Sequence, residues 1–256
     1  MGTYIKVVSS VKPINKISVL VNGVIKNIKS GWVFVNGQRK QVFPTTEAWT
    51  EIYNKGTPGS YSQTLGFGKY RIVMSGAGGA GGVAIDTRRL IDAKAQDGSA
   101  GELQDFYFNV ADGETINVSG VVGAGAGQSI IDGRSNNTTT TIGTPGTGYA
   151  SGTNGAAAGV YMGGEHYGSV SGSGGGSTNA NVGGTNHIAK GGNGGSASEG
   201  YHSGTRQPGT GGSGGVSSGA GAAGGKGYRT RLPGWIHSEA GSNGYIRIYK
   251  SNFYPA

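Results

Sequence analysis

The stretch Tyr70-Arg-Ile-Val-Met-Ser-Gly-Ala-Gly-Gly-Ala-Gly-Gly82 decides the fold of this chain. Its first five residues predict a β-strand, which leads directly into a tract made of glycine and alanine. A second strand-like run, Tyr245-Ile-Arg-Ile-Tyr249, closes the series. Between the two runs, further glycine-dense tracts recur at 123–127, 172–176, 191–195, 209–215 and 219–227.

Glycine at this density usually indicates disorder, because glycine loses the most backbone entropy on folding and buries no side chain. The chain has 55 Gly and 7 Pro in 256 residues. Three observations favour an ordered fold instead. Apolar runs bracket the tracts, aromatic residues are plentiful, and charges are sparse in the glycine-rich part.

The polyproline II conformation is an extended, left-handed helix with three residues per turn and no internal hydrogen bonds. Glycine lets such backbones approach closely enough to pair with one another. The fold class that we predict is therefore mostly β or irregular. A sandwich of polyglycine II helices, lying side by side as parallel rods and framed by a few strands, would be held by backbone hydrogen bonds rather than by an apolar core. Collagen is excluded because glycine does not keep every third position.

The charge of the chain is unevenly placed. Residues 1–75 hold ten Lys or Arg against two Glu, whereas residues 76–256 hold eleven of each sign. A basic first segment is compatible with binding to nucleic acid, with docking on an acidic protein surface, or with simple solvation. Since no basic cluster is interleaved with aromatic residues, we expect no nucleic-acid partner.

The basic segment contains a repeat with an offset of fourteen residues. Val19-Leu-Val-Asn-Gly-Val-Ile-Lys-Asn-Ile28 matches Val33-Phe-Val-Asn-Gly-Gln-Arg-Lys-Gln-Val42. Asn-Gly between apolar runs is a strong hairpin signal, because a type I′ turn needs positive φ at both central residues. We therefore predict two hairpins in an attachment module, residues 1–60, followed by the glycine-rich domain, residues 61–256.

Finer expectations concern the segments around the tracts. Residues 45–53 suggest a single helical turn, residues 54–60 a linker, and residues 83–95 a helical insertion. Runs 106–110 and 115–119 predict strands around the turn 111–113, forming one small sheet with the runs 70–74 and 245–249.

Several chemical motifs are tempting, and we set them aside. Residues 76–81 satisfy the dinucleotide fingerprint G-x-G-x-x-G, yet no acidic second strand and no series of helices follow. Residues 220–227 lack the first glycine and the Ser or Thr of a phosphate-binding loop. The histidines are scattered, cysteine is absent, and Glu165, Glu199 and Glu239 are isolated from other carboxylates. We expect no catalytic residue, no metal and no cofactor.

The insertions between tracts share a composition of Tyr, Trp and His among small polar residues. Large stiff aromatic contacts beside adaptable hydrogen-bonding groups are typical of recognition loops. The same rings could instead cap a scaffold that has no apolar core. The aromatic and histidine residues in question are Tyr149, Tyr161, His166, Tyr167, His187, Tyr201, His202, Tyr228, Trp235 and His237.

The strand followed by Ser75-Gly-Ala-Gly-Gly-Ala-Gly-Gly82, the spaced tracts and Gly241-Ser-Asn-Gly-Tyr-Ile-Arg-Ile-Tyr249 resemble the glycine-rich domain of bacteriophage tail proteins. Residues 65–250 are similar to the tip adhesins of T-even-type long tail fibres, whose tracts form a polyglycine II sandwich. The resemblance implies that loops between tracts contact a bacterial surface receptor. Carried over, the receptor-binding residues are Tyr161, His166, Tyr167, Tyr201, His202, Tyr228, Arg229, Trp235 and His237.

The sequence thus predicts a non-enzymatic receptor-binding adhesin of a tail fibre or tail tip, assembled in the host cytoplasm and located on the virion. Its expected partners are a host outer-membrane protein or glycan and, through residues 1–60, other virion proteins; a homo-oligomer is also compatible. No apolar run reaches the length of a membrane span. Two alternatives stay open. One is a structural virion protein whose loops contact neighbouring subunits. The other is an ice-binding polyglycine protein, a function that would require flat faces of small residues.

Overall fold

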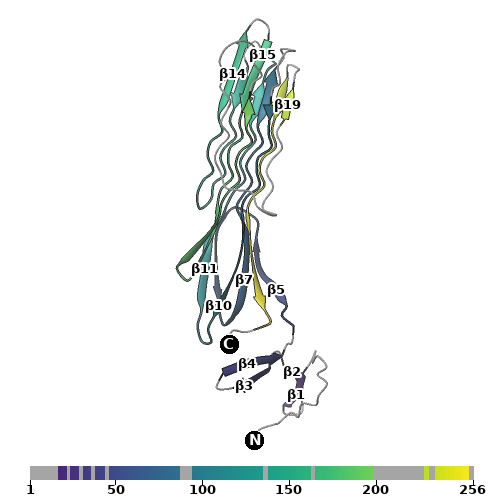
Figure 1. The fold of residues 1–256 in the computed structure, drawn as a ribbon, viewed down its shortest axis with the longest axis vertical. Coiled ribbons are helices and arrows are strands. Elements are labelled where there is room, and N and C mark those ends of the chain that lie inside the picture. The colour runs from purple at the N-terminus through teal and green to yellow at the C-terminus, as the bar shows by residue number, and fades with distance from the viewer. Residues whose placement is uncertain are drawn as a thin grey trace.

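The computed structural model describes residues 17–21, 24–28, 31–35, 38–43, 46–86, 94–134, 138–162, 165–198, 228–230 and 234–253. All regular elements assigned in these ranges are β-strands. The molecule is long and narrow (Figure 1), with strands at both ends and extended segments between them. Within the described ranges, no helix is long and apolar enough to cross a membrane.

A sandwich of two antiparallel four-stranded sheets forms what we call the near end. The first sheet has the order β10 (Leu103–Val110), β7 (Gly68–Ser75), β21 (Tyr245–Ser251), β5 (Trp49–Lys55). The second has the order β17 (Thr185–Ala189), β16 (Thr178–Val182), β11 (Ile116–Val122), β6 (Gly59–Leu65).

The two sheets enclose an apolar core. Alternation along β7 buries Tyr70, Ile72 and Met74 with 2 % exposure or less, because successive side chains of a strand point to opposite faces. They pack with residues from both sheets, among them Val118 of β11 and Ile248 of β21. The glycine-rich part therefore does have an apolar interior, contrary to the prediction that backbone pairing alone holds it.

Glycine-rich segments of seven residues lie between the near end and the other end of the molecule. We number them in chain order as tracts 1 to 8: 76–82, 96–102, 123–129, 142–148, 150–156, 171–177, 190–196 and 238–244. Successive tracts run in opposite directions (Figure 1): six of them lead from strands at one end to strands at the other, and the chain turns back at residue 149 between tracts 4 and 5. The predicted parallel rods thus alternate in direction.

Tract 1 donates all seven of its N–H groups to neighbouring tracts, over 2.8 to 3.1 Å, and the acceptor tract changes in a repeat of three. The acceptors lie in tract 2 for Gly76, Gly79 and Gly82, in tract 6 for Ala77 and Ala80, and in tract 8 for Gly78 and Gly81.

The carbonyls of tract 1 add two more neighbours. Those of Ala77 and Ala80 accept from tract 7, and that of Gly78 accepts from tract 3. The same step of three recurs elsewhere: residues 96, 99 and 102 of tract 2 donate to tract 7, and residues 238, 241 and 244 of tract 8 donate to tract 3. Tract 1 is therefore the centre of the bundle, with five other tracts bonded to it.

Close approach explains the glycines of tract 1. A β-carbon on Gly76 or Gly79 would lie within 3.0 Å of backbone atoms of tract 7. Ala77 and Ala80, in contrast, carry a fully buried β-carbon. Glycine is thus required only on the side of the backbone that touches another backbone.

Two further sheets form the far end. One has the order β14 (Ala157–Met162), β15 (Glu165–Val170), β8 (Val83–Asp86), β19 (Tyr228–Thr230), and the other the order β13 (Thr139–Thr141), β12 (Ile130–Asp132), β20 (Trp235–His237). A short pair, β18 (Ala197–Ser198) and β9 (Lys94–Ala95), completes this end. Val83, Ile85, Ile131 and Val170 are its buried apolar core, against which Ile236 packs.

Two hairpins precede the sandwich, as the repeat predicts. β1 (Ile17–Val21) pairs with β2 (Val24–Ile28), and β3 (Gly31–Val35) pairs with β4 (Gln38–Phe43), both antiparallel. The registers Val21↔Val24 and Val35↔Gln38 leave two residues for each connection. The Asn-Gly pairs themselves lie outside the described residues. Figure 1 places the hairpins beyond the near end.

Three local predictions are wrong. Residues 49–55, within the expected helical turn and linker, form β5 and pair with β21, so the sandwich begins before residue 60. Residues 83–86 form β8 rather than the start of a helix. The run 115–119 joins the second near-end sheet, not the sheet of β7 and β21. In each case long-range pairing overrides local propensity.

Candidate functional site

The far end gathers the candidate binding residues that the structure describes. Tyr161 and His166 are paired residues of the hairpin β14–β15, and Tyr167 pairs with Asp86 of β8. Tyr228 and Arg229 lie in β19, which pairs with β8 in parallel. The remaining described candidates, Trp235 and His237, lie in β20, whereas Tyr201 and His202 lie outside the described residues.

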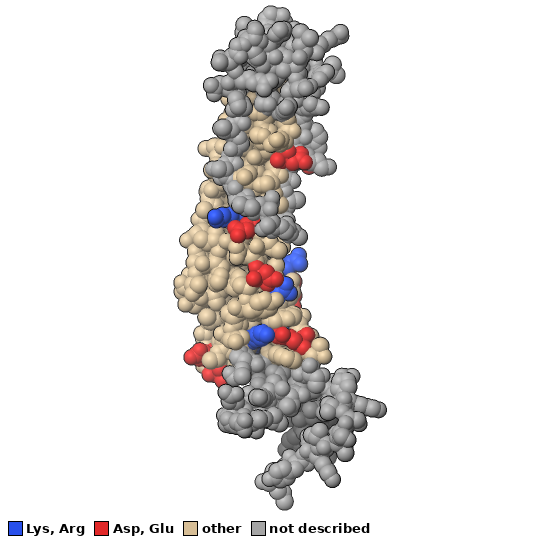
Figure 2. Space-filling model, in the orientation of Figure 1, with Lys and Arg blue, Asp and Glu red and all other residues tan. Residues whose placement is uncertain are grey.

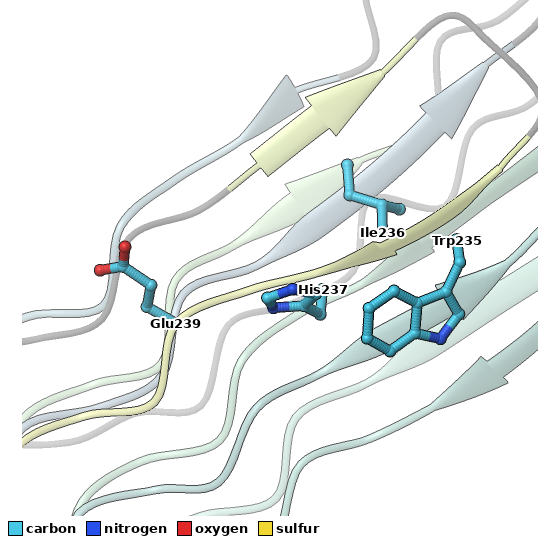
Figure 3. Close-up of a pocket in the computed structure, with 4 residues that line it drawn as sticks. All are labelled: Trp235, Ile236, His237 and Glu239. Atoms are coloured by element: carbon cyan, nitrogen blue, oxygen red, sulfur yellow. The ribbon is translucent and has the colours of Figure 1, made fainter.

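The far-end core fixes how β20 presents its side chains. Ile236 packs on the core, so its neighbours Trp235 and His237 project from the opposite face of the strand. Figure 3 shows this arrangement, with Ile236 on one side of β20 and the two rings on the other. The alternation in Trp-Ile-His thus places an indole and an imidazole together on the outer face.

The two rings form an aromatic pair at the edge of an open hollow. Their centroids lie 4.8 Å apart with a tilt of 51°, and Trp235 is 52 % exposed. His237 Nδ1 lies 3.2 Å from the carbonyl oxygen of Ser238. The hollow measures about 370 Å³ and is lined by Trp235, Ile236, His237 and Glu239 (Figure 3). It offers a half-exposed apolar surface beside groups that can form hydrogen bonds.

An ion pair on the neighbouring strand borders this aromatic pair. Asp132 of β12 pairs in register with Trp235. The Arg134 guanidinium binds its carboxylate in a bidentate way, with Nε to Oδ1 at 2.9 Å and Nη2 to Oδ2 at 2.7 Å, and the Arg134 amide donates at 3.1 Å. These hydrogen bonds from Arg134 lower the pKa of Asp132 to about 2. The pair is therefore fully ionised at neutral pH.

Sequence reasoning missed Asp132, Arg134 and the threonines of β13. The alternation of β12, with Ile131 buried and its neighbours half-buried, could have identified Asp132 as an outward residue. That strand has only three residues, which is too short for a period of two to stand out against a glycine-rich background.

Charge is sparse on the described part of the viewed face (Figure 2). Several basic side chains there lie next to acidic ones, some acidic groups lie apart from any basic group in this view, and most of the described surface on this face is uncharged. Arg71–Asp105 at 2.6 Å and Lys69–Glu47 at 3.0 Å are examples of such pairs at the near end. The described part of this face is therefore suited to neutral or mixed partners rather than to a polyanion.

Two aromatic insertion residues lie away from the far end. His187 of β17 stacks on Phe106 of β10 with ring centroids 3.8 Å apart, which joins the two near-end sheets. Tyr149 is half exposed, and its amide donates to Ser177 beside the start of β16. The insertions thus divide between the two ends, because successive tracts alternate in direction.

The dinucleotide-like motif at 76–81 lies in tract 1, whose backbone is already hydrogen-bonded. The seven amides of 76–82 all donate to protein carbonyls, so a pyrophosphate would have to displace these bonds, and a strand follows instead of a helix. Among the residues described, no group of three or more His, Cys, Asp or Glu could hold a metal ion. The loop 220–227 lies outside the described part.

A scan of the chain against protein-family models finds no match, and a search of curated proteins finds none either.

Proposed function

We propose that this protein is a non-enzymatic phage virion protein, a receptor-binding adhesin of a tail fibre or tail tip. It presents its far end to a protein or glycan of the host surface. The observation that carries the proposal is the gathering of candidate binding residues from three chain regions, β14–β15, β19 and β20, at one end of the molecule. The hairpins lie at the other end (Figure 1), so attachment through them would leave the far end exposed.

The finer architecture belongs to the same proposal: the tracts are polyglycine II helices. The recurrence of hydrogen-bond acceptors every third residue supports this, because a helix with three residues per turn directs residues i and i+3 to the same neighbour. A β-strand would direct residues i and i+2 there. Backbone dihedrals near φ −75° and ψ +145°, from NMR chemical shifts of tract 1, would be the expected result.

The test of the function uses the purified full chain, fluorescently labelled and mixed with cells of the host on which the phage grows. We expect saturable binding that Trp235→Ala abolishes and that Tyr107→Ala leaves unchanged. Tyr107 is a matched control, because its ring is 54 % exposed on the near-end sheet. Saturable binding that is equally strong in the Trp235→Ala variant would contradict the role of the far end, and no binding at all would contradict the adhesin.

Residues 1–60 are the proposed attachment module. Support comes from their positive charge and from the position of the hairpins, at the end of the molecule away from the candidate site. Since β5 belongs to the sandwich, the part of this module that can act independently ends before Trp49. A virion partner would be recovered by full-length protein and lost when residues 1–45 are removed.

A structural virion component is a second candidate function, favoured by the outer face of the sheet β10-β7-β21-β5. The Arg71 guanidinium lies over the rings of Tyr107 and Tyr249, at 5.7 and 5.9 Å from their centroids. Trp49 meets Tyr107 edge to face at 5.5 Å. Trp, Tyr and Arg are the residues that dominate protein interfaces, so this face is suited to a neighbouring subunit. In this case the purified chain would not bind cells.

A further inference from the structure

We propose that the outer face of the sheet β13-β12-β20 binds the neutral pyranose ring of a cell-surface polysaccharide. The inference rests on the proposed adhesin function and deepens it, because it names a sugar as the ligand of the far end.

The register of the three strands builds two rows of side chains across this face. One row is Trp235, Asp132 and Thr139, and the other is His237, Ile130 and Thr141. The residues between the rows, Ile131 and Ile236, point into the far-end core. Because side chains alternate along each strand, both rows share the outer face.

Trp235 supplies the apolar platform. Its indole is half exposed and lies at the hollow of about 370 Å³, with the His237 ring next to it. A pyranose ring has one face made largely of C–H groups and an edge of hydroxyl groups. Stacking of that C–H face on an exposed indole removes apolar surface of both partners from water.

The strands next to β20 supply both hydrogen-bond donors and hydrogen-bond acceptors. Three hydrogen bonds from Arg134 reach the Asp132 carboxylate, which has about four acceptor positions, so Oδ2 can accept one more. The guanidinium has five N–H donors, of which two bind the carboxylate. Thr139 and Thr141 are exposed, and each hydroxyl can donate and accept. Adjacent sugar hydroxyls also donate and accept, so this set matches them.

Charge favours a neutral sugar over an anionic one. The two charges on the β12 side of the platform, Asp132 and Arg134, neutralise each other at 2.7 Å. A small apolar pocket with a few convergent polar groups is the usual form of a small-ligand site.

The test is saturation-transfer NMR on the full chain with the methyl glycosides of glucose, galactose, mannose and N-acetylglucosamine at millimolar concentration. We expect transfer to the C–H face of at least one sugar, and a shift of one of the three indole N–H resonances, which Trp235→Phe would assign. Trp235→Ala should reduce affinity at least tenfold, and Asp132→Asn should reduce it severalfold. Trp49→Phe, at the near end, should leave it unchanged. Absence of transfer from all four sugars, or transfer unaffected by Trp235→Ala in a folded protein, overturns the proposal.

A cell experiment separates this inference from the adhesin function. Periodate cleaves the vicinal diols of surface glycans, whereas protease removes exposed proteins. Binding to host cells that is lost after periodate supports the sugar ligand. Binding that depends on Trp235, survives periodate and is lost after protease overturns the sugar ligand while the adhesin stands. Absence of binding to untreated cells overturns the adhesin itself.

Discussion

At the scale of single residues, the tracts place glycine where two backbones touch and alanine where they do not. The β-carbon of Ala77 is buried without conflict, whereas one on Gly79 would fall within 3.0 Å of the Asn193 carbonyl and the Gly194 nitrogen. The Asn193 carbonyl already accepts a hydrogen bond from the Ser99 amide of tract 2, so it cannot move aside cheaply.

Gly79→Ala should therefore destabilise the protein strongly. We expect a loss of about 3 kcal/mol in the free energy of unfolding, the upper range for overpacking of a filled interior. Denaturant unfolding measures it. Gly56→Ala is the control, since no atom lies within 4 Å of a β-carbon there, and it should change stability by at most about 1 kcal/mol, in the stabilising direction. Equal stability of the two variants would refute the close-packing argument.

The ion pair at the candidate site makes a prediction about pH. Because hydrogen bonds from Arg134 lower the pKa of Asp132 to about 2, the folded state is favoured above the ordinary pKa of 3.8. The stability that the ionised Asp132 gives to the folded state is lost as the pH falls through about 2. A carboxyl-carbon NMR titration should give a midpoint near 2 for Asp132, and Arg134→Gln should raise the midpoint toward 3.8. An unchanged midpoint in the variant would mean that Arg134 is not the cause.

At the scale of elements, local signals predicted several strands and part of one sheet: the runs 70–74, 106–110 and 245–249 lie together as β7, β10 and β21. The repeat Val-x-Val-Asn-Gly predicted both N-terminal hairpins, because a two-residue turn is encoded by the residues it contains. In contrast, β5 looked helical because its local sequence resembles a capped turn, and its pairing with β21 joins residues about 200 positions apart. No local pattern encodes such a contact.

For the candidate site, too, the sequence predicted some of the residues but not which residues surround them. Composition singled out Trp235 and His237 as candidate recognition residues, and the structure places their rings together on one face of β20. Asp132 was missed because it reaches Trp235 only through the pairing of β12 with β20, which joins residues 103 positions apart. Long-range pairing, rather than residue type, determines which side chains surround an aromatic platform.

The hydrogen-bond pattern of the tracts predicts their amide exchange. All seven amides of tract 1 donate to other tracts at the centre of the bundle, so we expect them to exchange only with large-scale opening. Residues 96, 99 and 102 of tract 2 should be protected as well, in a step of three. Hydrogen exchange followed by NMR is the measurement, with the exposed turn 111–113 as the fast-exchanging reference. Fast exchange within 76–82 would contradict the bundle.

At the scale of the whole molecule, the tracts join two apolar cores that do not touch. The near-end core lies between the two four-stranded sheets, and the far-end core lies around Ile85 and Ile131. A seven-residue tract in the polyproline II conformation spans about 22 Å. Because the tracts between the cores bond to one another along their length, they can neither separate nor slide without breaking many hydrogen bonds at once. The two ends should therefore unfold together.

Single-tryptophan variants test this coupling. Trp49 reports on the near end when Trp32 and Trp235 are replaced by Phe, and Trp235 reports on the far end when Trp32 and Trp49 are replaced. Thermal unfolding should give the same midpoint for both reporters. Ile248→Ala, which opens a cavity in the near-end core, should lower both midpoints equally, because it removes about 2–5 kcal/mol from the one shared transition. Ile188→Ala, on a side chain that is 37 % exposed, should change either midpoint little. If Ile248→Ala lowers the midpoint at Trp49 and leaves that at Trp235 in place, the tracts do not couple the ends, and the far end is held by its own core alone.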